Sequence, residues 1–305
     1  MLPYCLWLSC LGLQNCRRAS LKVRLQTSAV VQGVAYLDDE VSKVYVICTN
    51  CDTISVFHAM PPYEQVRGLH VSGLRQPTDI VACTTNGLLY VSDWAAHCVW
   101  QVTSGGKVDW RLPTWSPTKR KTDAFHPISL SVRSGRLVVV EISKVSVCNA
   151  HDDRVYEINF PESVTLHHAS ETEHQSYLIA MTDSSTDKRH SVICEMKQDH
   201  DGKWITAREL GLNSVLPRTH ISRPRYMTWD TRGYLYIAAD DSHKVLVLDS
   251  ELNMVQTVRL RKHSMPYRMC FLTRQAILLL AVDAGFSVNV YDGIMPPPQY
   301  PKKLQ

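Results

Sequence analysis

Acidic residues that end apolar, strand-like segments are the first candidates for chemistry in this 305-residue chain. Five such acids occur: Asp93, Glu141, Asp183, Asp240 and Asp283. Gathered around one axis, carboxylates could hold a hard divalent cation, which takes six or more oxygen ligands. The alternative is structural, because an Asp at a strand end can accept hydrogen bonds from backbone N–H groups of the following turn. We favour structural turns, since Thr49 occupies the matching position of the first segment.

Other side chains with catalytic or metal-binding potential are few. His167, His168 and His174 lie among three glutamates and could form a metal cluster, but a polar surface loop explains them as well. The close pair Cys48 and Cys51 has no second pair or His partners at zinc spacing. G-x-S-x-G, P-loop and H-E-x-x-H motifs are absent. We therefore predict a non-enzymatic protein with no catalytic residue, metal or cofactor.

The segments that end in these acids repeat along the chain. "PTDIVACTTNGLLYVSDWAAHCVWQV" begins at Pro77 and "PRYMTWDTRGYLYIAADDSHKVLVLD" at Pro224, and the spacing from the Pro to the strand-ending Asp is the same in both. Weaker copies make six in total, and their strand-end positions recur at fairly even intervals. Strands repeating with a period of roughly 40 to 50 residues are typical of propeller blades. The sequence predicts an all-β, six-bladed β-propeller of four-stranded antiparallel blades.

The two ends of the repeat region complement each other. The last copy lacks a fourth strand, and Leu21–Thr27 alternates with period two ahead of the first copy. We expect this N-terminal strand to close the ring, which removes free sheet edges. The predicted organisation is a leader at 1–18, the propeller at 19–293 and a Pro-rich tail at 294–305, with leader and tail disordered. The apolar run at 5–13 is far shorter than the roughly 20 residues that span a bilayer and has its arginines on the wrong side for a secretory signal.

The repeated phrase resembles the NHL repeat. Five positions match in each of two copies: Pro77, Gly87, Leu89, Tyr90 and Asp93, and then Pro224, Gly233, Leu235, Tyr236 and Asp240. The copies depart from the family where Asn and Arg often follow the Asp. The resemblance implies a six-bladed propeller that binds protein or RNA, as in the substrate-recognition part of tripartite-motif ubiquitin ligases. The chain has no C-x-x-C series with interleaved His, so RING and B-box catalysis is not expected of it.

A second family of six-bladed propellers provides the alternative function. Gluconolactonase-type hydrolases hold one calcium-type ion at the axis with a Glu and several Asn or Asp. The first copy here has "VQGVAY" where such an enzyme would start with a Glu. A metal-dependent, lactonase-like hydrolase therefore stays the alternative to a binding module.

Basic residues concentrate in four of the links that join one blade to the next. These links, at 68–77, 113–127, 212–225 and 260–268, carry a net charge of +9, whereas the whole chain carries +4 and the remainder therefore −5. Since such links share one face of a propeller, we predict a basic face that binds single-stranded RNA or an acidic protein segment. Charged, solvated loops are the alternative explanation. The predicted ligand-binding residues are Arg75, Lys119, Arg120, Lys121, Arg218, Arg223, Arg225, Arg261, Lys262 and Arg268, with Trp115, Phe125 and Tyr267 as aromatic partners.

The cysteines and the remaining composition indicate the compartment. The 10 cysteines follow no regular spacing, and several lie in apolar segments: Cys83, Cys98, Cys148, Cys194 and Cys270. This pattern favours buried, reduced thiols in a cytoplasmic protein. We expect no membrane association and no small-molecule substrate.

Overall fold

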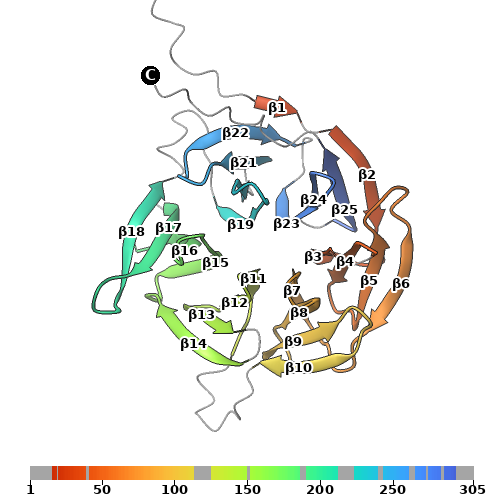
Figure 1. The fold of residues 1–305 in the computed structure, drawn as a ribbon, viewed down its shortest axis with the longest axis horizontal. Coiled ribbons are helices and arrows are strands. Elements are labelled where there is room, and N and C mark those ends of the chain that lie inside the picture. The colour runs from red at the N-terminus through yellow and green to blue at the C-terminus, as the bar shows by residue number, and fades with distance from the viewer. Residues whose placement is uncertain are drawn as a thin grey trace, which may run out of the picture.

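Six blades of four antiparallel strands surround a central axis, as the view down that axis shows (Figure 1), and one blade carries an additional parallel strand. The computed structural model describes residues 16–18, 20–38, 41–112, 125–149, 152–185, 190–211, 223–239, 243–260, 265–272, 274–282 and 285–292. All elements in these ranges are strands, so the predicted all-β, six-bladed propeller is confirmed. No membrane-spanning helix can be formed by the described elements, since none of them is helical.

The blades follow one another in chain order, each beginning with its innermost strand. Blade 1 contains β3 (Val31–Leu37), β4 (Lys43–Cys48), β5 (Thr53–His58) and β6 (Gln65–His70). Blade 2 contains β7 (Pro77–Cys83), β8 (Leu88–Asp93), β9 (Cys98–Thr103) and β10 (Val108–Leu112). Blade 3 contains β11 (Ser129–Arg133), β12 (Arg136–Val140), β13 (Lys144–Asn149) and β14 (Asp152–Asn159).

The second half of the ring repeats this order. Blade 4 contains β15 (Val164–Glu171), β16 (Tyr177–Asp183), β17 (His190–Gln198) and β18 (Trp204–Gly211). Blade 5 contains β19 (Pro224–Trp229), β20 (Leu235–Ala239), β21 (Lys244–Leu248) and β22 (Met254–Arg259). Blade 6 contains β23 (Pro266–Leu272), β24 (Ile277–Val282) and β25 (Ser287–Asp292), and its outer strand is β2 (Ser20–Gln26).

Strand β2 closes the ring as predicted. It pairs antiparallel with β25, from Ser20 opposite Asp292 to Gln26 opposite Ser287, and lies outside β25 in Figure 1. The predicted leader ends earlier than expected, because β1 (Cys16–Arg18) pairs in parallel with β22. The rest of the leader and the Pro-rich tail lie outside the described residues.

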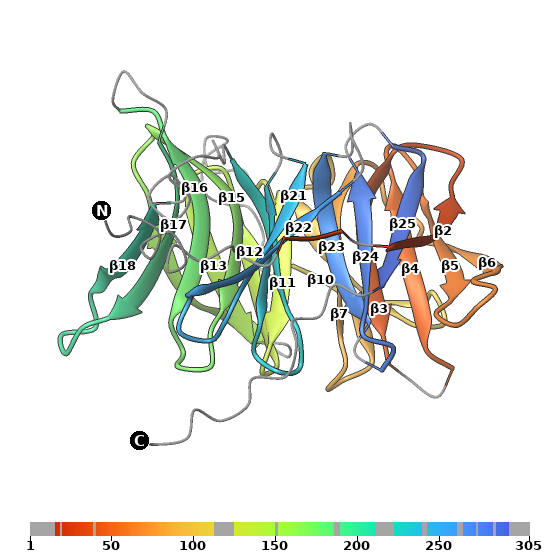
Figure 2. The same cartoon turned by 90° about the horizontal axis from the view of Figure 1, so that it is seen from above.

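The hydrophobic core lies between neighbouring blades. Six buried apolar clusters occur, one for each pair of adjacent blades. Middle strands are buried on both faces and therefore read as continuous apolar runs, such as "LYIAA" in β20 and "ILLLAV" in β24. The seven cysteines whose side chains are described are free thiols, and five of them are buried. Seen from its edge in Figure 2, the ring has two faces, where turns and links join the strands.

These two faces have different connections. The links from the outer strand of one blade to the first strand of the next lie on one face, which we call the link face. The turn after each first strand lies on the opposite face, which we call the turn face. Each first strand therefore runs from the link face to the turn face.

Candidate functional site

A ring of polar residues surrounds the axis near the link face. Five first strands carry a local irregularity near their start, which leaves one residue unpaired. The residue that follows this irregularity occupies an equivalent position in each of the five strands. In blade 3, whose first strand is regular, Ser129 occupies the equivalent position. These six residues are Gly33, Asp79, Ser129, His168, Tyr226 and Arg268, which we call the axial ring. The five side chains of the axial ring are all buried.

Asp79 is the anionic centre of the axial ring. Its Oδ2 accepts hydrogen bonds from the Ser129 hydroxyl at 2.9 Å and the Leu130 N–H at 2.8 Å, and its Oδ1 accepts from the Ile80 N–H at 2.9 Å. Arg268 Nε lies 3.3 Å from Oδ1. Burial raises the pKa of Asp79, while the Arg268 charge and the three donors oppose this rise.

Arg268 connects three blades. Its Nη2 donates to the carbonyls of Thr78 at 3.3 Å and Ile128 at 3.1 Å, so blade 6 is held to blades 2 and 3. Burial alone lowers the pKa of Arg268, but the Asp79 charge, aided by Tyr267 and Tyr226, raises it above its ordinary value. The guanidinium is therefore positively charged at neutral pH. Both partners of the ion pair with Asp79 are buried.

Blade 1 lies between blades 6 and 2 and contributes only Gly33 to the axial ring. A Cβ at Gly33 would lie 2.9 Å from both the backbone N and Cγ2 of Ile80. Any side chain would therefore force blades 1 and 2 apart. The absence of a side chain here lets Arg268 reach past blade 1 to Asp79.

Ser129 joins Asp79 to His168. The Ser129 hydroxyl donates to Asp79, so its single hydrogen is used there. The 2.7 Å contact between Ser129 Oγ and His168 Nδ1 must then have Nδ1–H as the donor. With Nδ1 as the donor to Ser129, Nε2 is the ring nitrogen without a proton. Burial, reinforced by the Arg268 charge, keeps the pKa of His168 well below 6.5, so the ring is neutral.

The axial ring contains Ser, His and Asp but cannot act as a nucleophilic triad in this arrangement. A triad requires the histidine to accept the serine proton, whereas Ser129 gives its proton to Asp79. The ring also supplies one carboxylate, and a guanidinium is paired with it. A calcium-type ion would need several oxygen ligands, so these residues do not fit a lactonase-like metal site.

The predicted basic face is only partly described. Arg75 is exposed, Arg223 and Arg225 are half-buried, and all three lie on the link face. Seven predicted residues lie outside the described part of the chain: Trp115, Lys119, Arg120, Lys121, Arg218, Arg261 and Lys262.

Two of the predicted contact residues are buried. Arg268 was predicted as an exposed ligand-binding residue, but only 5% of it is exposed, because it is the second residue after Pro266 and faces the axis. Phe125 is buried against the core between blades 2 and 3. The Tyr267 ring is half-buried and lies 4.3 Å from the Arg268 guanidinium.

The strand-ending acids have local partners where they are described. Asp93 is fully buried and accepts hydrogen bonds from the backbone N–H groups of Arg75 (2.7 Å), Gln76 (3.0 Å) and Ala96 (3.0 Å). Asp183 accepts from the Ser185 N–H at 2.8 Å. Glu141 accepts from the Ser146 hydroxyl at 2.8 Å. Asp240 and Asp283 lie outside the described residues.

The histidine-rich segment is not a surface loop. His167 and His168 belong to β15, with His168 at the axis, and only His174 is exposed in the following turn. Glu171 is buried and paired with Arg136. Within the described ranges, no three His, Cys, Asp or Glu side chains are grouped to hold a metal ion.

Sequence reasoning missed the axial ring. Four of its members follow a repeat proline by two residues: Asp79, Ser129, Tyr226 and Arg268. A polar residue at this position in an otherwise apolar strand was the available signal. Blade 1 and blade 4 lack the proline, so Gly33 and His168 could not be found in this way.

The fold defines the class of this protein as a six-bladed β-propeller, and one of its blades matches the NHL repeat. The NHL repeat model matches residues 74–102, which cover the first three strands of blade 2 almost completely, and the predicted resemblance is confirmed. Comparison with curated proteins finds no match.

Solved structures share this fold at low sequence identity. Hydrazine synthase from Kuenenia stuttgartiensis is 15% identical over 85% of this chain and 82% of that chain, with a TM-score of 0.62. A streptogramin B lyase structure is 10% identical over 90% of this chain and 97% of that chain, with a TM-score of 0.60. At these identities the similarity shows the fold alone.

Proposed function

We propose that this protein is a non-enzymatic binding module that holds an acidic protein segment on its link face. One observation carries the proposal, namely that Arg223 and Arg225, at the start of blade 5, lie close enough to blade 4 for their charges to act on His167. His167 of blade 4 has its pKa lowered to about 4 by burial and then by the charges of Arg225, Arg223 and Arg268. Arg223 and Arg225 are therefore close to blade 4 as well as part of blade 5. A concentration of positive charge at one mouth suits an anionic partner.

The aromatic residues favour protein over single-stranded RNA as that partner. RNA bases would stack on exposed aromatic faces. On the described link face, Trp94 already stacks on His126 with ring centroids 4.6 Å apart, Tyr267 lies against Arg268, and Phe125 is buried. A substrate-recognition role of the kind found in tripartite-motif ligases would use the same face. The free thiols support a cytoplasmic site for this function.

Fluorescence anisotropy with labelled oligoglutamate and oligouridylate tests the proposal. Oligoglutamate should bind the wild type, and its affinity should fall as salt is raised. The double variant R223E/R225E should bind at least tenfold more weakly. The control R67E/R208E makes the same charge change on exposed residues of the outer strands β6 and β18 and should bind as the wild type does.

Three outcomes would contradict the proposal. Equal binding by R223E/R225E and the control would show that the link face is only solvated. Tight binding of oligouridylate without oligoglutamate would make RNA the partner. Stoichiometric calcium binding with hydrolysis of a lactone would favour the hydrolase alternative, although the axial ring does not offer the required ligands.

A further inference from the structure

A cavity of about 260 Å³ lies along the axis on the turn-face side of the axial ring. Its wall is formed by the first strands of all six blades, mostly beyond the axial ring. It reaches the turn face beside Asp230 and Thr231, which follow β19. Tyr226 belongs to both the axial ring and the cavity wall, so the ring closes the inner end.

The two sides of this cavity differ in chemistry. Blades 1, 2 and 6 contribute mainly apolar side chains, such as Val34, Ile80 and Met269. Blades 3, 4 and 5 contribute more polar side chains, among them Ser131, Arg133, Ser170 and Asp230. A ligand that fits this wall has an apolar body and one polar end.

Strand β11 provides two donors on one face. Ser131 and Arg133 are two residues apart, so their side chains lie on the same face of the strand as that of Ser129, and both residues line the cavity. The Ser131 Oγ is buried and has no hydrogen-bond partner among the described residues. A ligand acceptor would satisfy this hydroxyl, which otherwise remains desolvated and unpaired.

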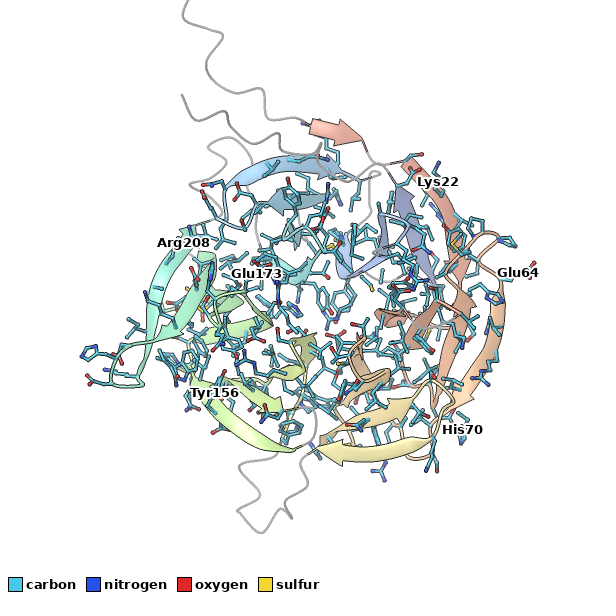
Figure 3. All side chains as sticks on the ribbon, viewed as in Figure 1. Lys22, Glu64, His70, Tyr156, Glu173 and Arg208 are labelled. Carbon is cyan, nitrogen blue, oxygen red and sulfur yellow. The ribbon has the colours of Figure 1, made fainter. Side chains whose placement is uncertain are left out.

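Arg133 is placed to receive a carboxylate. Its guanidinium lies 5.1 Å from the centre of the Trp229 ring, and this cation–π contact helps to orient the guanidinium group. Nη2 donates to Glu173 Oε1 at 3.0 Å, and the Glu173 side chain is 60% exposed. Figure 3 shows Glu173 nearer the centre of the ring than Arg208. The Arg133 charge also acts on the carboxylate of Glu171. Since a guanidinium has five N–H donors and one of them is used by Glu173, donors remain for the carboxylate of a ligand.

Among the described residues that line the cavity, Asp230 is the acidic one. Its carboxylate already has an ion-pair partner and several hydrogen-bond donors. Its Oδ2 accepts from Arg232 at 3.2 Å and from the Tyr236 hydroxyl at 3.2 Å. Its Oδ1 accepts from the backbone N–H groups of Arg232 and Tyr234, each at 2.9 Å. A cationic ligand would therefore find no unsatisfied carboxylate in the described part of the wall.

We propose that the axial cavity binds a small organic monocarboxylate with an apolar body. Arg133 pairs with the carboxylate, Ser131 donates to it, and the apolar body packs against the first strands of blades 1, 2 and 6. The sequence offered no reason to expect a small-molecule ligand. This site is at the opposite end of the axis from the basic link face, so it does not depend on the proposed protein partner.

Phenylacetate, phenylacetamide and phenethylamine provide matched anionic, neutral and cationic probes. Titration calorimetry and saturation-transfer NMR on the whole chain would measure their dissociation constants. Phenylacetate should bind in the millimolar range or tighter, as expected of so small a ligand. The amide and the amine should bind at least tenfold more weakly, because neither forms an ion pair with Arg133.

Variants at the mouth of the cavity identify the site. R133Q should weaken phenylacetate binding at least tenfold, and E173Q should strengthen it severalfold by removing the competing carboxylate. The matched control is R274Q, which breaks an ion pair between Arg274 and Asp38 on the same face outside the cavity wall. Its affinity should equal that of the wild type. A82L should abolish binding of every probe by filling the cavity, with circular dichroism confirming that it is folded.

Several results would overturn this inference. They are no binding of phenylacetate at millimolar concentrations, equal affinity for phenylacetamide, or an unchanged dissociation constant in R133Q. Binding that survives in folded A82L would place the ligand elsewhere. Because none of these measurements involves Arg223 or Arg225, failure here leaves the test of the link face unaffected.

Discussion

Replacing Arg268 by Met should destabilise the propeller by about 3–5 kcal/mol, the usual cost of removing one partner from a buried ion pair. Three contributions support a value in this range. The variant loses the contact with Asp79 at 3.3 Å, two hydrogen bonds to the Thr78 and Ile128 carbonyls, and cation–π contacts with Tyr226 and Tyr267. Asp79 keeps its three hydrogen-bond donors, which limits the loss.

The penalty for R268M should also depend on pH. Burial already raises the pKa of Asp79, and removing the opposing Arg268 charge should raise it further. A carboxyl whose pKa is higher in the folded state than in the unfolded state binds protons more tightly when the protein is folded. Lowering the pH therefore reduces the free-energy penalty of burying this carboxyl. The difference in unfolding free energy between wild type and R268M should therefore shrink as the pH falls from about 7 to about 5.

Urea unfolding followed by tryptophan fluorescence measures both effects. For a chain of this size, the loss corresponds to a decrease in Tm of roughly 5–8 °C. R274M is the control, since it breaks an exposed ion pair with Asp38 and should cost less than about 1 kcal/mol. A loss in R268M no larger than in this control, or one that does not change with pH, would refute the role assigned to the axial ion pair.

Three further predictions concern closure, a strand-end turn and acid stability. Deleting residues 20–26 should lower Tm sharply in a thermal scan, because the outer edge of blade 6 loses β2; an unchanged melting curve would contradict ring closure. Asp93→Asn should cost about 2 kcal/mol in urea unfolding, since the amide cannot accept all the N–H groups that Asp93 now accepts; stability equal to the wild type would contradict this role. His167 has a folded pKa of about 4, below its unfolded value, so its stabilisation is present above about 6.5 and is lost as the pH falls towards 4; His167→Gln should flatten the stability profile in this window, and an unchanged profile would contradict the lowered pKa.

The fold could be predicted because a propeller repeats one local pattern. Pro77 and Pro224 start first strands, and Gly87 and Gly233 have positive φ in the turn that follows. Repetition of these turn signals identified the blades, and the surplus N-terminal strand identified closure. Both inferences need only local sequence and the rule that sheet edges are paired.

The site was less predictable because burial at the axis depends on six segments at once. Arg268 was counted as an exposed charge, since its segment reads as a basic link. Its carboxylate partner, Asp79, comes from blade 2, far earlier in the chain, and its segment shows no charge pattern of its own. His168 was similarly assigned to a polar loop, because its buried position follows from the placement of Ser129 and Tyr226 beside it.

The reach of Arg268 has a consequence for biosynthesis. Asp79 leaves the ribosome early with blade 2, yet its guanidinium partner is translated only with blade 6. In a nascent chain that stops before blade 6, the Asp79 carboxylate lacks its counter-charge. Asp79 can therefore be buried stably only after Arg268 has been translated. Pairs so distant in sequence also slow folding, since a long loop must close before the contact forms. The first blades should therefore remain sensitive to protease on stalled ribosomes and become resistant together once Arg268 has emerged.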